Sequence, residues 1–389
     1  MTLLSDLPPL DSYMSLLKRN IDLLVAAMWH DNRFFLLMVS ILLLPLTALY
    51  WLISFYLQVR KVQQRQPSLV SAQLELPVII VGNISVGGTG KTPILINLAK
   101  QLSDAGYRPA IISRGYGGIA TTNKNKVVSV RPDSDPQFCG EEPVLIAQSL
   151  MNIPVIVSAQ RVLAFNYVAN NTPSNVVLSD DGLQHYQLPR SIEIAVIDTA
   201  KGLGNRLLLP SGPLREPFSR LHSVDHIVLN GPPNDKVHAQ MKILSDKTTS
   251  TLINIKAMRE CQPCGTINHY SSIADICNKL NQFHSLHMLA GIGNPSKFFT
   301  TVNSVFGDVD KKPILIPYAY SDHHRYTIED VQSLDDIPSK EALIMTAKDA
   351  VKLQSLANRL SKCYFIIDIE TVLDDDVTLA IIERLNKNK

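Results

Sequence analysis

The chain has 389 residues, which exceeds one typical domain and predicts two domains with additional segments. Its formal net charge of +2 provides no general electrostatic basis for binding nucleic acid. Five cysteines in a chain of this length exclude the dense disulfide framework of a small secreted protein and favour a reducing compartment.

The N-terminal part contains a hydrophobic segment. After a mixed extension over residues 1–33, residues 34–57 carry no charged side chain. About 20 apolar residues are enough to cross a bilayer, so this segment predicts a helix at a membrane. Tyr50 and Trp51 lie toward one end, as interfacial aromatics do. Pro45 predicts a kink, which leaves open whether the segment spans the bilayer or lies in its interface.

The residues after this segment indicate its orientation. Arg60, Lys61 and Arg65 follow it closely, within a polar linker over residues 58–76. Because positive charge gathers on the cytoplasmic side of a membrane, the C-terminal part of the chain is expected there.

Residues 77–245 alternate between short β-branched runs and helical patterns, which predicts a parallel sheet with helices on both faces. The expected strands are 78–81, 110–113, 127–130, 155–157, 176–178, 192–197 and 226–229, and the expected helices are 92–105, 142–151 and 159–170. In such a sheet, ligands bind at the carboxyl ends of the strands.

A polar stretch near residue 245 predicts a boundary, followed by a second, smaller α/β domain over residues 246–389. Its expected strands lie near 252–255, 288–290, 314–316, 343–345 and 364–367, and its expected helices are 295–305, 328–334, 348–360 and 377–386.

A glycine-rich stretch between the first expected strand and helix has the context of a phosphate-binding loop. Its nucleotide-binding candidates are Gly87, Gly88, Thr89, Gly90, Lys91 and Thr92. Lysine at this position reaches the β- and γ-phosphates, and the following hydroxyl ligates Mg²⁺. The match is incomplete, because Ser85 replaces the usual first glycine and Val86 replaces the signature lysine of partner-dependent ATPases.

Further polar clusters follow other expected strands. Asp180 and Asp181 come directly after 176–178, where a P-loop protein usually places a carboxylate for Mg²⁺. Arg114, in a glycine-rich loop after 110–113, suits an anion or phosphate contact. In the second domain, Asp322-His323-His324 is rich in proton-transfer groups, and it also fits a metal site or a surface turn.

These pieces in this order resemble the tetraacyldisaccharide 4′-kinase family of Gram-negative bacteria. The resemblance covers the hydrophobic segment and nearly all of residues 77–350. Its motifs are V-G-N-I-S-V-G-G-T-G-K-T-P, S-R-G-Y-G-G, G-E-E-P, S-A-Q-R, D-D-G-L-Q-H, L-P-S-G-P-L-R-E-P, G-I-G-N-P-S-K-F-F, S-D-H-H-R-Y and T-A-K-D-A-V-K.

The resemblance implies a Mg²⁺- and ATP-dependent kinase that phosphorylates the 4′-hydroxyl of an acylated glucosamine disaccharide 1-phosphate. It places the enzyme at the inner membrane, with the catalytic domains on the cytoplasmic side, and implies no obligate protein partner. By resemblance, Lys91 and Thr92 bind the triphosphate and Mg²⁺. The remaining matched residues are Asp180, Asp181 and Glu216 near the metal, and Arg114, Gln184, His185 and Arg215 near the substrate.

The catalytic carboxylate departs from the family pattern. The usual aspartate of G-D-E-P is Glu141 here, paired by resemblance with His323 beside Asp322. Either Glu141 is the base, or Asp180 or Asp322 takes that role. The alternative class is a membrane-tethered P-loop ATPase or switch that acts on a protein partner. The second-domain Asp-His-His cluster and the absence of a lysine at Val86 argue against that class.

Overall fold

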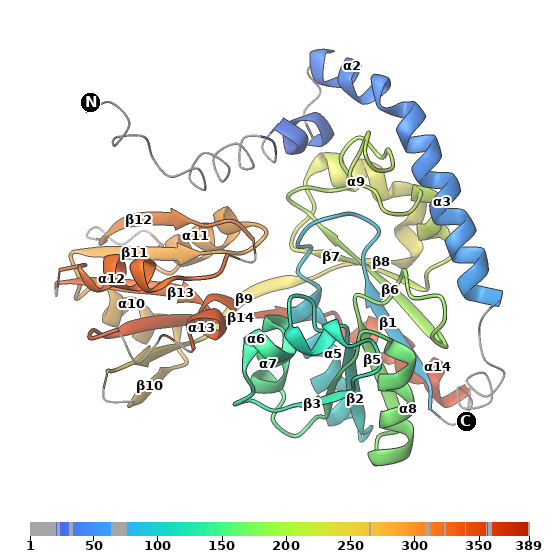
Figure 1. Cartoon of the computed structure of the whole chain (residues 1–389). Helices are drawn as coiled ribbons and strands as arrows, with labels where there is room; N and C mark the ends of the chain where they lie inside the picture. The colour runs from blue at the N-terminus through green and yellow to red at the C-terminus, as the bar shows by residue number, and fades with distance from the viewer. Residues whose placement is uncertain are drawn as a thin grey trace, which may run out of the picture.

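The chain folds into a larger lobe, a smaller lobe and an N-terminal helical segment that lies along the larger lobe (Figure 1). This computed structural model describes residues 21, 24–30, 34–63, 76–263, 266–307, 312–322, 324–338, 340–354, 356 and 360–387. The larger lobe contains the predicted first α/β domain, and the smaller lobe contains most of the predicted second one.

The larger lobe is built on an eight-stranded sheet with the order β3-β4-β2-β5-β1-β6-β7-β8. Every neighbouring pair is parallel except β3 with β4. The strands are β1 (Val78–Gly82), β2 (Pro109–Ser113), β3 (Val128–Val130), β4 (Val155–Val157), β5 (Val176–Asp180), β6 (Ile192–Asp198), β7 (His226–Asn230) and β8 (Thr248–Ser250). The predicted parallel sheet is therefore confirmed, and β8 is an addition that the sequence pattern did not reveal.

Helices cover both faces of this sheet, because both faces of its central strands are apolar. Ile79 and Val81 of β1 belong to one core, and Val78 and Ile80 belong to the other. The first face carries α5 (Lys91–Asp104), α7 (Glu141–Ser149) and α14 (Asp375–Lys387), and the second carries α8 (Arg161–Asn171) and α9 (Asp235–Met241). The short helix α6 (Pro136–Cys139) leads into α7.

The smaller lobe contains a six-stranded mixed sheet with the order β10-β9-β14-β13-β11-β12. Its strands are β9 (Leu252–Cys261), β10 (Ile267–Tyr270), β11 (Ser285–Ala290), β12 (Ile314–Ala319), β13 (Glu341–Thr346) and β14 (Tyr364–Val372). One face is covered by α10 (Ile273–Leu280) and α11 (Pro295–Ser304), and the other by α12 (Ile328–Asp335) and α13 (Ala347–Leu353).

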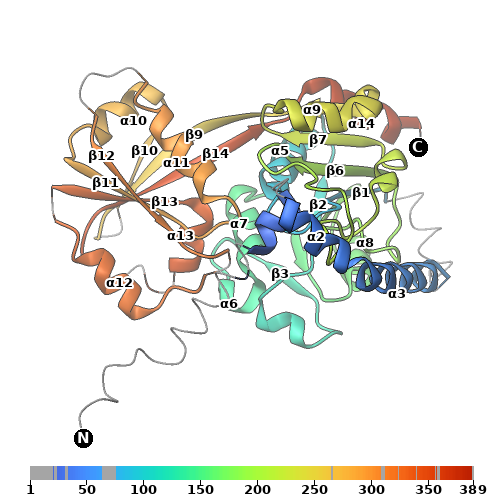
Figure 2. The same ribbon diagram turned by 90° about the horizontal axis from the view of Figure 1, so that it is seen from above.

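Two long antiparallel strands connect the lobes. β9 and β14 pair along their length and run from the smaller lobe to the larger one (Figure 2). After β14 the chain returns to the larger lobe, where Val377, Ile381 and Leu385 of α14 share a core with α5. The second domain predicted over residues 246–389 therefore does not coincide with the smaller lobe, because α14 packs with the larger lobe.

The N-terminal hydrophobic segment forms two helices, α2 (Phe34–Leu42) and α3 (Leu44–Gln63). The break beside Pro45 confirms the predicted kink, since proline cannot donate the helical hydrogen bond at that position. Within the described residues, no single helix combines the length and the hydropathy needed to cross a bilayer.

One side of α3 contacts the larger lobe. The Thr47 hydroxyl donates a hydrogen bond to Ser211 Oγ (2.7 Å), and the Tyr50 hydroxyl donates to the Arg215 carbonyl (3.1 Å). The more sheltered positions of α3 include Thr47, Tyr50, Ser54 and Gln58, whose spacing of three or four residues defines one helical face. The helix therefore docks by a mostly polar stripe.

We predict that Ile381→Ala lowers the free energy of unfolding by about 2–5 kcal/mol, because a fully buried branched side chain is replaced by a cavity. Urea denaturation measures this change. Leu379→Ala on the same helix is the matched control, since Leu379 is 56% exposed and its loss should be nearly neutral. Equal effects of the two substitutions would contradict the docking of α14 on the larger lobe.

Candidate active site

The phosphate-binding loop lies between β1 and α5, as predicted. Lys91 begins the helix, and Gly90 before it adopts a left-handed conformation with φ +77°. No side chain caps this helix N-terminus, so its first backbone N–H groups are available to an anion. The Val86 amide donates to the Pro213 carbonyl (2.9 Å), which anchors the loop to the neighbouring L-P-S-G-P segment.

Asn230, at the end of β7, contacts the backbone of the phosphate-binding loop. Its Nδ2 donates a hydrogen bond to the Thr89 carbonyl (3.0 Å). A Cβ atom on Gly90 would lie 1.9 Å from the same nitrogen, so the positive φ and the close approach both require glycine here. The conformation of the loop thus depends on a residue 141 positions away in the sequence.

Asp180 ends β5 directly beside the phosphate-binding loop, because β5 and β1 are parallel neighbours that pair Val81 with Asp180. The side chain is 2% exposed, and its Oδ2 accepts a hydrogen bond from the Ser113 hydroxyl (3.1 Å). Burial, together with the nearby charges of Glu142 and Asp181, raises the pKa of Asp180 to about 6. Its Oδ1 is buried without a hydrogen-bond partner in the structure.

Asp181 lies among cations. Its carboxylate is 3.4 Å from Lys91 Nζ and 3.3 Å from Arg215 Nη1. Burial raises the pKa of Asp181, but Lys91, Arg215 and Arg161 outweigh it and hold the pKa at about 2. Asp181 is also a non-glycine residue with φ +47°, and such backbone strain concentrates at functional sites. The two adjacent carboxylates are therefore held in opposite electrostatic environments.

The residues around the loop fit Mg²⁺. Among the described residues, no three His, Cys, Asp or Glu side chains come together as a metal-binding group. Asp180 and Asp181 form a pair, and Mg²⁺ is usually held by one or two carboxylates together with phosphate oxygens and water. The unpartnered Oδ1 of Asp180 and the nearby Thr92, which lines the same cleft, supply suitable oxygen donors.

Glu216, predicted to lie near the metal, is held by three neighbouring side chains. Its carboxylate accepts hydrogen bonds from Gln184 Nε2 (2.7 Å) and the Tyr186 hydroxyl (2.5 Å), and it pairs with Arg220 Nε at 3.2 Å. The side chain is buried, and Glu216 is not among the described residues that line the cleft. These contacts favour a role in holding Gln184, and the metal-ligand role of Glu216 stays a prediction.

The predicted substrate-binding residues Arg114, Gln184, His185 and Arg215 all line one cleft. Burial, together with the positive charges of Arg161, Lys61 and Arg114, lowers the pKa of His185 to about 2. His185 is consequently neutral at physiological pH. We call the part of the cleft around Arg114, His185 and Arg215 its basic end. The cations there make it suitable for an anionic group.

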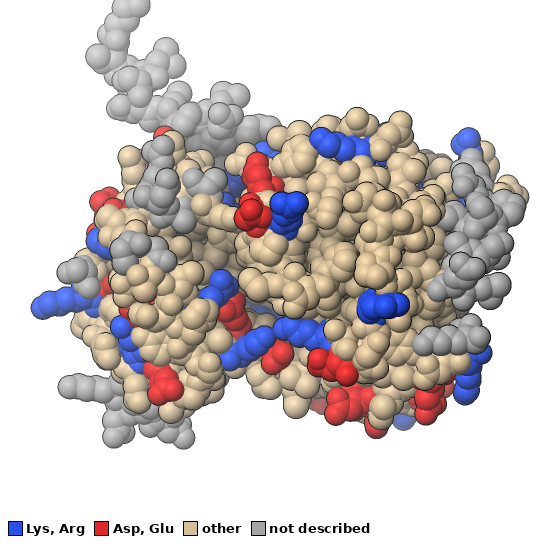
Figure 3. All heavy atoms as spheres, turned by 90° about the horizontal axis from the view of Figure 1, so that it is seen from below, with Lys and Arg blue, Asp and Glu red and all other residues tan. Residues whose placement is uncertain are grey.

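The cleft has a volume of about 1190 Å³ and is lined by both lobes and by the strands that join them. Charged side chains of both signs gather where the two lobes meet (Figure 3). On the smaller lobe, the loop after β11 reaches the phosphate-binding loop. A Cβ atom on Gly293 would lie 3.0 Å from the Gly88 Cα and 3.3 Å from Asp322 Oδ2. The two lobes therefore touch at the phosphate-binding loop.

The structure describes Glu141, the predicted base, but not His323, its predicted partner. Glu141 and Glu142 begin α7, and of the two Glu142 lines the cleft. Asp322 also lines the cleft, and its catalytic role stays a prediction. His323 lies outside the described residues, so its pairing with Glu141 stays a prediction.

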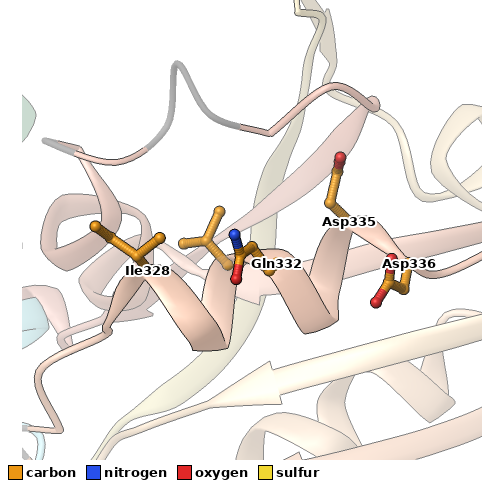
Figure 4. A pocket seen from close by; sticks show the side chains of 5 residues that line it. Ile328, Gln332, Asp335 and Asp336 are labelled. Carbon is orange, nitrogen blue, oxygen red and sulfur yellow. The ribbon is translucent and has the colours of Figure 1, made fainter.

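A second hollow of about 400 Å³ lies along α12 and is separate from this site (Figure 4). It is lined by Ile328, Val331, Gln332, Asp335 and Asp336. None of these is a predicted site residue.

Sequence reasoning missed several residues of the cleft. Arg161 is buried, and its Nη2 donates hydrogen bonds to the backbone carbonyls of Asp180 (2.6 Å) and Asp181 (3.1 Å). Lys348 lines the cleft from the smaller lobe. Both residues lie in the motifs S-A-Q-R and T-A-K-D, but nothing in those motifs indicates which distant groups they contact.

Comparison with known proteins identifies similar sequences. The family model described as "Tetraacyldisaccharide-1-P 4'-kinase" (LpxK) matches residues 39–386. A tetraacyldisaccharide 4'-kinase of Nitrosococcus oceani is 39% identical over 314 residues, which cover 80% of this chain and 81% of the relative. Another, from Shewanella frigidimarina, is 34% identical over 346 residues, covering 89% of this chain and 91% of the relative.

A solved structure has a similar fold. The crystal structure of "apo" form LpxK from Aquifex aeolicus, in complex with ATP, matches with a TM-score of 0.64. The match covers 89% of this chain and 99% of the other at 24% sequence identity. At this identity, the likeness supports the two-lobed α/β fold.

The raised pKa of Asp180 generates a test of its environment. Between about pH 3.8 and pH 6, the folded protein binds this proton and the unfolded chain does not, so stability falls as the pH rises through that window. We predict that Asp180→Asn stabilises the metal-free protein at pH 7.5 by roughly 1–3 kcal/mol. Chemical denaturation in the presence of EDTA at pH 7.5 and pH 5 measures this.

The stabilisation should shrink at pH 5, where Asp180 is largely protonated in the folded protein. Asp368→Asn is a control at an ion pair with Arg259 in the smaller lobe. A destabilised Asp180→Asn protein at pH 7.5 would contradict the electrostatic environment described for Asp180.

Proposed function

The chain belongs to the tetraacyldisaccharide-1-P 4′-kinase family. We propose that, in this cleft, the protein transfers the γ-phosphoryl group of ATP to the 4′-hydroxyl of a tetraacylated glucosamine disaccharide 1-phosphate. The protein is a Mg²⁺- and ATP-dependent kinase of lipid A synthesis. The observation that carries this assignment to the cleft is the meeting of three groups at one point: the uncapped start of α5, Lys91, and the Asp180–Asp181 pair.

The phosphate-binding loop supplies the site for the nucleotide. The backbone N–H groups at the start of α5 would bind the triphosphate, and Lys91 would neutralise negative charge on the β- and γ-phosphates. Thr92, Asp180 and Asp181 would hold Mg²⁺, which would supply positive charge against the phosphate oxygens. Since Asp181 also pairs with Lys91, the carboxylate keeps the lysine close to the loop before nucleotide arrives.

The basic end of the cleft suits the lipid acceptor. Arg114, His185 and Arg215 line it, and a neutral His185 can donate or accept a hydrogen bond with a sugar hydroxyl. Tyr50 of α3 lines the same cleft. The N-terminal helix therefore flanks the cavity where the acceptor binds.

The apolar surface of α3 supports attachment to a membrane. Leu49, Leu52 and Phe55 are each more than half exposed, and Arg60 and Lys61 follow in the last turn. A helix with one docked side and one exposed apolar side can lie in the interface of a bilayer. We place this surface on the cytoplasmic leaflet of the inner membrane, where the acylated acceptor can enter the cleft directly.

Deprotonation of the acceptor hydroxyl requires a carboxylate within hydrogen-bond reach. Glu141 remains the base by its match to the family motif, with His323 as its partner. Glu142 and Asp322 line the cleft from opposite lobes and are the neighbouring acidic groups. Approach of the two lobes would exclude water, so that the sugar rather than water receives the phosphoryl group.

Lys91→Ala should reduce phosphoryl transfer by about 10³-fold or more, because phosphate-stabilising cations contribute several kcal/mol in the transition state. The assay uses labelled ATP, Mg²⁺ and purified disaccharide 1-phosphate lipid, with the labelled product separated by chromatography. Lys312→Ala, at an exposed position of the smaller lobe, should leave the rate unchanged.

Two results would reject this assignment. A folded Lys91→Ala protein with near wild-type transfer would remove the phosphate-binding loop from the mechanism. Hydrolysis of ATP by the wild-type protein without transfer to lipid would instead favour a P-loop ATPase that acts on a protein partner.

The membrane proposal is tested on the exposed side of α3 alone. We expect the combined replacement Leu49→Glu, Leu52→Glu and Phe55→Glu to abolish flotation with phosphatidylethanolamine–phosphatidylglycerol vesicles, because charged groups oppose burial in the apolar phase. Transfer to lipid presented in vesicles should fall, while ATP binding stays unchanged.

The matched control replaces exposed apolar residues elsewhere, Ile243→Glu and Leu379→Glu, which lie outside α3. These variants should float like the wild type. Undiminished flotation of the α3 variant would show that α3 is not the membrane-binding surface.

A further inference from the structure

Lys348 joins the two lobes through acidic side chains. It lies in α13 of the smaller lobe, and its Nζ is 3.2 Å from Glu142 Oε1 and 3.5 Å from Asp322 Oδ1. Glu142 belongs to α7 of the larger lobe, whereas Asp322 belongs to the smaller lobe. All three side chains line the cleft.

Lys348 is more sheltered from water than its two partners. Its side chain is 17% exposed, whereas those of Glu142 and Asp322 are 34% and 31% exposed, so the contact lies at the wall of the cleft. Burial alone would lower the pKa of Lys348, but Glu142 and Asp322 outweigh it and raise the pKa. Removing one partner from such a pair leaves an uncompensated charge, so the arrangement is sensitive to the relative position of the lobes.

Two other lysines also cross between the lobes but differ in their partners. Lys201 Nζ donates to the Gly293 carbonyl (2.9 Å). Lys297 Nζ donates to the Asn230 carbonyl (2.9 Å) and lies 3.9 Å from a single carboxylate, Asp198 Oδ1. Each of these contacts fixes the backbone near the phosphate-binding loop. Lys348 instead bridges two carboxylates, and both of these residues line the cleft.

The base of Lys348 is held rigidly by the next residue. Asp349 is fully buried and accepts hydrogen bonds from the Gly291 amide (3.1 Å), the Tyr326 hydroxyl (3.0 Å) and the Thr346 hydroxyl (2.6 Å). It thereby ties the end of β13 to the chain segments that follow β11 and β12. Lys348 thus projects from a fixed point into the cleft.

From this geometry we infer that Lys348 is a positioning residue, which holds Glu142 of the larger lobe against Asp322 of the smaller lobe and so assembles the acidic side of the reaction space. The inference rests on the proposed function, since it concerns the same transfer reaction. Lys348 acts through the two carboxylates and through the closeness of the lobes. It is separate from the phosphate-binding loop, so nucleotide affinity does not depend on it.

The test compares Lys348→Met with the wild-type protein in the lipid transfer assay. We expect kcat to fall by roughly 10²-fold, the loss that follows when reacting groups are misplaced by about 1 Å. The dissociation constant for Mg²⁺-ATP, measured by calorimetry, should change less than about threefold, since the loop contacts are intact. Lys348→Arg should recover most of the rate, because a guanidinium can pair with both carboxylates.

The matched control is Lys279→Met, which removes a lysine–carboxylate pair with Glu260 (2.9 Å) within the smaller lobe, and kcat should be unchanged. Glu142→Gln and the double variant complete a thermodynamic cycle. Non-additive losses support the bridge, because residues that act as one unit couple. If Lys348→Met does not fold, Lys348→Gln with Glu142→Gln supplies the same cycle.

Small-angle scattering with a non-hydrolysable ATP analogue adds a structural readout. The wild type should be compact, as in the structure where the lobes touch, and Lys348→Met should be more extended. Wild-type kcat in Lys348→Met, or strictly additive losses in the cycle, would overturn the inference. Failure of the wild-type protein to phosphorylate lipid would reject the proposed function instead, so the two failures are distinguishable.

Discussion

Two adjacent carboxylates at the end of β5 set the main electrostatic constraint of the site. Asp180 is buried with one unpartnered oxygen, and Asp181 is surrounded by Lys91, Arg215 and Arg161. Without these cations, the charge of Asp181 beside the buried Asp180 would disfavour ionisation of both carboxylates. The same imbalance that costs stability leaves Asp180 suited to a divalent cation. The phosphate-binding loop, its lysine and the basic end of the cleft are therefore parts of one charge arrangement.

The connection between the lobes explains how this arrangement can serve a two-substrate reaction. β9 and β14 form the link, and α14 then packs against α5, the helix that begins with Lys91. The smaller lobe is consequently fixed to the nucleotide-binding helix from one side. On the other side, Gly293 lies against Gly88. The acceptor can reach the reaction space past α3, where Tyr50 borders the cleft.

The parts predictable from sequence are those with strong local signals. β1, the glycine-rich loop and α5 follow from one continuous stretch, and Asp180 follows from the apolar run before it, since neighbouring parallel strands end at one edge. The contacts of Asn230 with Thr89 and of Lys348 with Glu142 join residues 141 and 206 positions apart, so no local pattern indicates them. The same reason explains why α14 was assigned to the second domain. Its apolar face is evident in the sequence, but the partner of that face is not.

The central claim is that ATP binds at the start of α5 with its terminal phosphate between Lys91 and the Asp180–Asp181 pair. A crystal structure of the protein with Mg²⁺ and a non-hydrolysable ATP analogue tests it most directly. The account predicts density for the triphosphate against residues 87–92, with the metal beside Thr92 and one or both aspartates. Nucleotide bound elsewhere, for example in the hollow along α12, would contradict it.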